Sequence, residues 1–137
     1  MFYEFRITTP ANTSSDDPLG TQLQLDEGVI TAVEVLFPPG CVGLVHLQVR
    51  RELHQIWPAN ADADLAGDTF PIRWDDEVPV DEPPYVLTAV TWSDDDSYAH
   101  TVTLRIEFVP MAIWRRSRPA LAALEYLAQW FAQGAPP

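Results

Sequence analysis

TVTLRIEFV, residues 101–109, is the stretch of this sequence that decides the fold. Its apolar residues Val102, Leu104, Ile106 and Phe108 alternate without a break with the polar residues at 101, 103, 105 and 107. Successive side chains of a β-strand point to opposite faces of the sheet. The alternation therefore predicts an antiparallel strand with one buried face and one solvated face.

Weaker copies of this alternation occur throughout residues 1–100, separated by segments rich in Pro, Gly, Asp and Ser. Turn signals at intervals of about 8–12 residues are typical of sandwiches and jelly rolls. We therefore predict an all-β fold, an antiparallel β-sandwich of jelly-roll type with about seven to eight strands. The strands are expected over residues 2–8, 21–25, 29–37, 43–51, 70–74, 85–92 and 101–109.

A C-terminal helix is expected after the sandwich, so the chain divides into a β-sandwich domain over 1–110 and a helical segment over 111–137. The helix itself is predicted from about residue 118 to 133, because Ser117 suits the N-cap and Pro119 suits the first turn. Its polar residues form only a narrow strip, which indicates that the helix buries more than one side. That strip consists of Glu125, Gln129 and Gln133.

The chain is strongly acidic, with 20 Asp and Glu against eight arginines and a formal charge of −12. A nucleic-acid partner is not expected, because binding phosphates requires a basic patch. The opening residues MFYEFRITTP contain no long apolar run, so we expect no membrane segment and synthesis in the cytoplasm. The single cysteine, Cys41, lies in apolar sequence and is expected to be a small core residue.

No motif for catalysis or for cofactor binding is present, so we expect neither enzymatic activity nor a cofactor. The polar residues His46, Gln48, Glu52 and His54 invite comparison with the metal site of cupins, but their spacing differs from the cupin pattern. No metal site is therefore expected there. Whether the acidic run Asp94–Asp96 binds calcium stays open at this point.

The five tryptophans suggest an alternative function. An exposed Trp57 or Trp92 on a β-sandwich would stack against sugar rings, which would make the chain a carbohydrate-binding module with a glycan as partner. Packing in the core or in an interface is the competing interpretation, since indole rings bury large apolar areas.

Three segments carry a resemblance to a known group of proteins: FPPGCVGLVH at 37–46, QIWP at 55–58 and DDDSYAHTVT at 94–103. Across residues 20–109 the chain resembles small proteins encoded among bacteriophage and prophage structural genes. The resemblance implies a virion component, such as a capsid decoration protein or a minor structural protein. It implies no catalytic residues.

The predicted helix adds apolar surface to a sandwich that already fills its own core, and spare apolar surface on a protein usually marks an interface. We therefore expect a non-enzymatic structural protein that self-associates or binds other virion proteins, located in the virion if a phage encodes it. The candidate interface residues are Leu121, Leu124, Tyr126, Leu127, Trp130 and Phe131, with Arg115 and Arg116 beside them.

Overall fold

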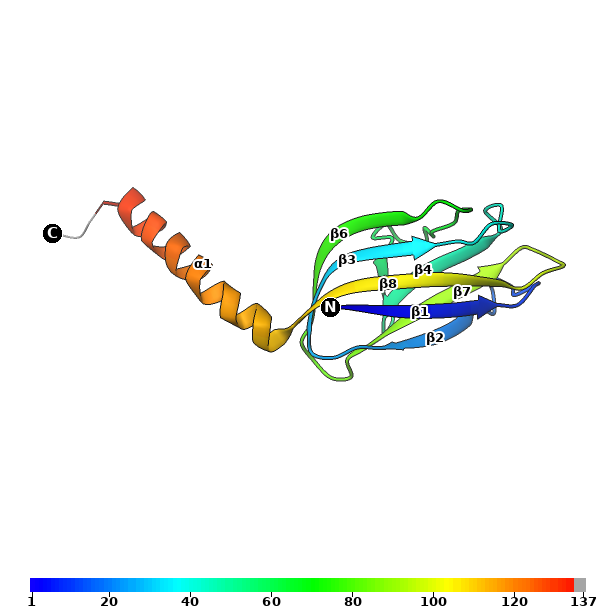
Figure 1. Ribbon diagram of the computed structural model, residues 1–137, viewed down its shortest axis with the longest axis horizontal. Coiled ribbons are helices and arrows are strands. Elements are labelled where there is room, and N and C mark those ends of the chain that lie inside the picture. The colour runs from blue at the N-terminus through cyan, green and yellow to red at the C-terminus, as the bar shows by residue number, and fades with distance from the viewer. Residues whose placement is uncertain (135–137) are drawn as a thin grey trace.

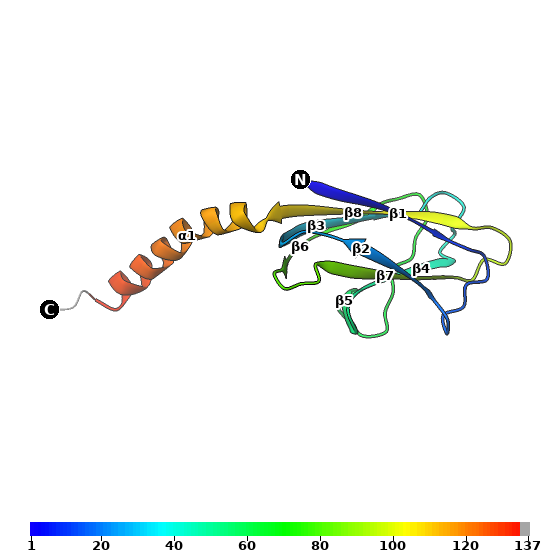
Figure 2. The ribbon, with the colours of Figure 1, turned by 90° about the horizontal axis from the view of Figure 1, so that it is seen from below.

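The structure, a computed structural model, describes residues 1–134, without the side chains of residues 118–122. Eight strands are followed by one helix, and the strands form two layers with the helix outside them (Figures 1 and 2). The strands are β1 (Phe2–Thr9), β2 (Leu19–Gln24), β3 (Gly28–Leu36), β4 (Val45–Arg51), β5 (His54–Trp57), β6 (Ile72–Val80), β7 (Val86–Ser93) and β8 (His100–Pro110), and the helix is α1 (Met111–Ala132).

The strand order identifies the fold as an eight-stranded jelly roll. One sheet has the order β1-β8-β3-β6 and the other β2-β7-β4-β5, and all neighbours are antiparallel. Two four-stranded sheets wound in this way are the jelly-roll arrangement. The predicted fold class, an antiparallel sandwich of jelly-roll type with a C-terminal helix, is confirmed.

The core lies between the sheets and follows the alternation of the strands. Val102, Leu104, Ile106 and Phe108 of β8 are all at most 1% exposed, as their spacing predicts. Cys41 is also fully buried, and burial raises the pKa of its thiol, which agrees with a core role. The core contains residues from every strand. Among the described side chains of α1, only that of Met111, its first residue, is buried.

Two strands differ from the sequence prediction. β5 lies in a segment that the sequence reads as irregular, because four residues are too few to show a period. β6 continues to Val80, through an acidic, proline-containing stretch that reads as a loop. It does so at the edge of its sheet, where charged side chains stay in water and Pro79 removes no pairing hydrogen bond.

The helix also begins earlier than its sequence predicts. α1 starts at Met111, directly after β8, and runs through Pro119. Ser117 is therefore not the N-cap, and its Oγ donates to the carbonyl oxygen of Trp114 at 2.9 Å. The start is set instead by a tertiary contact, since the Met111 amide donates to the carbonyl oxygen of Glu27 at 3.0 Å.

Candidate assembly interface

The most prominent feature of the molecule is that α1 projects away from the sandwich (Figures 1 and 2). Its contacts with β3 and β8 lie at its base. There the Arg115 guanidinium donates to Glu27 Oε1 at 3.4 Å, next to the amide contact of Met111. Most of the helix thus has no sheet against which to bury its apolar side chains.

The predicted interface residues lie on this projecting helix, and the structure leaves them uncovered. Leu124 is 63% exposed and Phe131 is 68% exposed, and the other large apolar side chains between them are exposed by 36% to 68%. Those other residues are Tyr126, Leu127 and Trp130. Arg115 and Arg116 are exposed near the base of the helix, whereas the side chain of Leu121 lies outside the described residues.

The isolated helix lacks the features that would stabilise it on its own. No side chain caps its N-terminus, and neither an acidic residue in its first turn nor a basic residue in its last turn favours the helix dipole. Pro119 has no amide hydrogen, and an interior proline costs about 3 kcal/mol. In proteins, most of the stability of a helix comes from tertiary packing of its apolar face. We therefore expect contact with another surface to stabilise the distal part of α1.

Charge is divided unevenly between the two parts of the chain. Residues 1–110 carry five arginines and nineteen acidic residues, a formal charge of −14. Residues 111–134 carry Arg115, Arg116 and Arg118 against Glu125, a formal charge of +2. The helix is thus a mildly basic, apolar extension of a strongly acidic body.

A second apolar surface lies at the open edge of the sandwich, where β5 of one sheet meets β6 of the other. The Trp57 and Trp74 rings meet there edge to face, with centroids 5.6 Å apart, and Trp57 Nε1 donates to Asp76 Oδ2 at 2.8 Å. We call this surface the edge groove. It is lined by Ile56, Trp57, Pro58, Ala59, Leu65, Trp74 and Asp76.

The two tryptophans considered for sugar stacking are not open platforms. Trp57 is only 4% exposed and its indole nitrogen is already hydrogen-bonded, so it packs in the core and offers no open face to a sugar ring. Trp92 is half-buried and stacks in parallel on His46 at a centroid distance of 5.2 Å.

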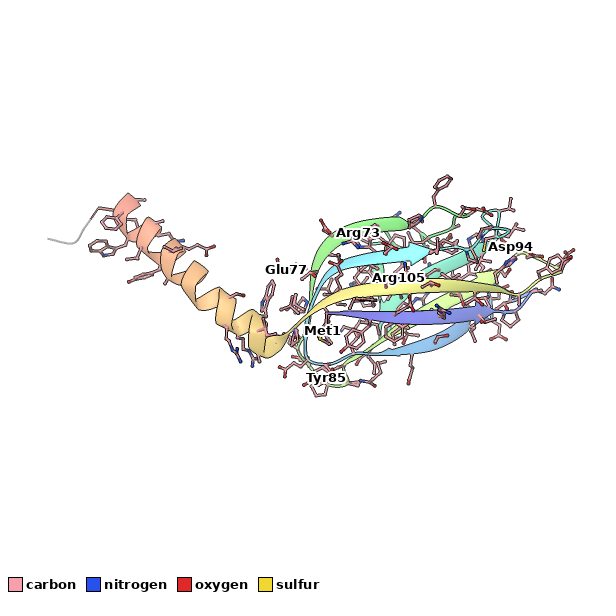
Figure 3. All side chains as sticks on the ribbon, viewed as in Figure 1. Met1, Arg73, Glu77, Tyr85, Asp94 and Arg105 are labelled. Atoms are coloured by element: carbon pink, nitrogen blue, oxygen red, sulfur yellow. The ribbon has the colours of Figure 1, made fainter. Side chains whose placement is uncertain are left out.

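His46 joins three segments at the loop end of the sandwich, opposite α1. Its Nδ1 lies 2.8 Å from Asp64 Oδ1, and its Nε2 lies 2.8 Å from Asp94 Oδ2, a residue labelled in Figure 3. Carboxylates only accept hydrogen bonds, so both ring nitrogens must donate and the imidazole is charged. Burial alone would lower the pKa of His46, but the bonds to Asp64 and Asp94 outweigh it and raise the pKa above its ordinary value of 6.5.

Sequence reasoning missed this group of His46, Asp64 and Asp94, which we call the histidine cluster, because its members are far apart in the chain. The only sequence signal is that His46 faces outward on an alternating strand.

The acidic run at 94–96 does not gather its carboxylates around one point. Asp94 turns to His46, Asp96 accepts from Ser97 Oγ, and Asp95 lies 2.6 Å from His100 Nε2. The hydrogen bond with His100 lowers the pKa of Asp95, and the Ser97 amide adds to that effect. Within residues 1–134, outside the undescribed side chains, no group of three or more His, Cys, Asp or Glu residues is placed to hold a metal ion.

Comparisons with known proteins add little to this geometry. No protein-family model and no curated protein matches the chain. Among solved structures, it is similar to a chain from the crystal structure of tomato aspermy virus, with 14% sequence identity and a TM-score of 0.47 over 80% of this chain and 79% of the other. A likeness this distant carries no argument about function. In the described part of the chain, no helix has the length and hydropathy of a membrane span.

Proposed function

We propose that this chain is a non-enzymatic structural protein of a phage or phage-like particle, a capsid decoration protein or minor virion component, that self-associates through α1. The single observation that carries the self-association is the projecting helix, with large apolar side chains exposed along its length. Exposed apolar surface of this kind marks an interface in a folded protein.

The fold is compatible with this role but does not establish it. Jelly rolls build viral capsid subunits and lectin domains alike, so the strand order does not choose between them. The resemblance of residues 20–109 to small phage structural proteins favours the virion. The buried, hydrogen-bonded state of Trp57 removes one of the two residues on which sugar binding would have depended.

Sedimentation equilibrium of the full chain tests the self-association. The wild type is expected to form oligomers. Leu124→Glu/Leu127→Glu is expected to be monomeric, because it places two charges among the exposed apolar side chains of α1. Gln129→Glu/Gln133→Glu adds the same charge on the polar strip and serves as the control. If both variants assemble like the wild type, α1 is not the interface.

Mass spectrometry of purified particles tests the virion assignment. The chain is expected in particles of the phage or prophage that encodes it, at a copy number proportionate to other structural proteins. Its absence from complete particles would contradict a structural role there.

A further inference from the structure

We propose that α1 of one copy docks in the edge groove of a second copy, so that the chains join head to tail. This inference rests on the proposed self-association and names the surface that receives the helix. It extends the helix-in-groove mode of recognition, in which an amphipathic helix lays its apolar face into an apolar groove.

The edge groove has the chemistry that such a helix needs. Its accessible apolar lining comes mainly from the half-buried Trp74, Ile56 and Leu65, because Trp57 is only 4% exposed. Its one charged lining residue is Asp76. The Asp76 carboxylate is fixed by the Trp57 indole and by the amide of Glu77, at 2.8 and 2.7 Å. The groove is thus apolar along its length and acidic on one rim.

Charge selects α1 of another copy as the occupant. The acidic rim is Asp76 of β6, which is exposed and is the carboxylate that lines the groove, whereas Glu77 lines a different pocket with Val29, Pro79 and Trp114. Residues 111–134 carry a formal charge of +2, opposite in sign to the −14 of residues 1–110, and their arginines precede the exposed leucines and aromatic residues of the same helix. A helix laid along the edge would bring arginines toward the rim and leucines toward the tryptophans.

The occupant comes from a second copy because α1 of the same chain leads away from the sandwich. Figures 1 and 2 show the helix continuing outward beyond the ends of β3 and β8, while β5 and β6 are edge strands of the two sheets. The donor surface and the acceptor surface are therefore different parts of the molecule. Contacts of this heterologous kind generate rings or open filaments, which suits a structural protein.

The test uses two full-length variants that each remove one of the two surfaces. Ala59→Arg places a long charged side chain in the edge groove, and because Ala59 is exposed, the core is not disturbed. Ala61→Arg, exposed two residues away and outside the groove lining, is the matched control. Leu124→Glu/Leu127→Glu removes the helix surface and leaves the groove intact.

Sedimentation velocity is then run on each variant and on mixtures. Ala59→Arg is expected to weaken self-association at least tenfold, and Ala61→Arg to leave it unchanged. An equimolar mixture of Ala59→Arg with the helix variant is expected to form a 1:1 heterodimer, because one partner still has its helix and the other still has its groove.

Two outcomes would overturn the inference in distinguishable ways. If Ala59→Arg assembles like the wild type, or if the mixture stays monomeric, α1 does not dock in the edge groove. The proposed self-association still holds in that case, provided that the helix variant by itself is monomeric. If the wild type is itself monomeric at all concentrations, the proposed self-association fails, and the inference fails with it.

Discussion

At the scale of single residues, neighbouring positions on β8 show how one strand serves two environments. Ile106 is fully buried between the sheets, paired across to Tyr3 of β1 and Val33 of β3. Arg105 faces outward and donates to Glu4 and Glu34, both at 2.9 Å. Glu4, Arg105, Glu34 and Arg73 follow one another across β1, β8, β3 and β6 in register, a row of alternating charges on the outer face (Figure 3).

We expect Ile106→Asp to prevent folding, because burying an unpaired carboxylate costs several kcal/mol, and a domain is stable by only about 5–15 kcal/mol. Arg105→Met is expected to fold, with a somewhat lower Tm, because it removes ion pairs at the surface only. Thermal unfolding of the soluble fractions measures both. An aspartate at position 105 would be a poorer control, since Glu4 and Glu34 would then flank a third carboxylate. Equal loss of folded protein from both variants would show that this strand is buried on both faces.

His46 predicts a dependence of stability on pH. Its pKa is raised in the folded protein, so its contribution is fully present below the ordinary pKa and is lost as the pH rises through the raised value. His46→Gln is expected to lose about 1–2 kcal/mol near neutral pH, as expected for hydrogen bonds to charged groups, and to lose this pH-dependent step. Urea unfolding across a pH series measures the free energy of unfolding of both proteins. His54→Gln, at an exposed position, is the control and should keep the step.

At the scale of elements, the sandwich and the helix differ in how much they depend on each other. All eight strands contribute buried side chains or pairing to the two sheets, whereas α1 contributes only Met111 to the buried set of described residues. Met111 also makes the amide contact with Glu27. We therefore expect the sandwich to fold without the rest of the helix, and we expect the rest of the helix to make contacts outside its own subunit.

Deletion of residues 112–137 tests this division. The truncated chain keeps Met111 and is expected to retain the cooperative unfolding transition of the full chain, with a Tm lowered by only a few degrees, but to be monomeric in light scattering. An unfolded product would mean that the helix belongs to the core of its own subunit. An unchanged oligomer would mean that the strands alone make the interface.

At the scale of the whole molecule, the net charge opposes assembly while the apolar helix favours it. Two copies of formal charge −12 whose centres are ~30 Å apart repel by roughly 20 kcal/mol in unscreened water. Two arginines placed ~8 Å from the carboxylate of Asp76 recover only about 1 kcal/mol by the same rule. Long-range repulsion therefore exceeds the local attraction at low ionic strength.

We therefore expect self-association to strengthen as salt rises from about 10 mM to about 150 mM, because the screening length falls from about 30 Å to about 8 Å while apolar burial persists. Sedimentation of the purified wild type across a salt series measures the change. Weakening of self-association over this range would show that ion pairs, rather than apolar contacts, dominate the interface.

The local pattern of apolar and polar residues by itself determined the type of several elements and which of their side chains are apolar. The alternation at 101–109 identifies β8 and its buried face, because side-chain direction in a strand depends only on the parity of the position. The segment rich in Ala, Leu and aromatic residues likewise identifies the helix and its apolar side chains, including Leu124 and Phe131. Both properties arise from neighbours in the chain, so they can be recognised without knowing the fold.

Only the tertiary structure decided which strands pair, where β5 and α1 begin and which distant side chains meet. The edge groove combines Trp57 with Trp74, and the histidine cluster combines His46 with Asp64 and Asp94, 18 and 48 positions away. The physical reason is that such contacts follow from the order of strands in two sheets, and a local period of two is the same for every strand order.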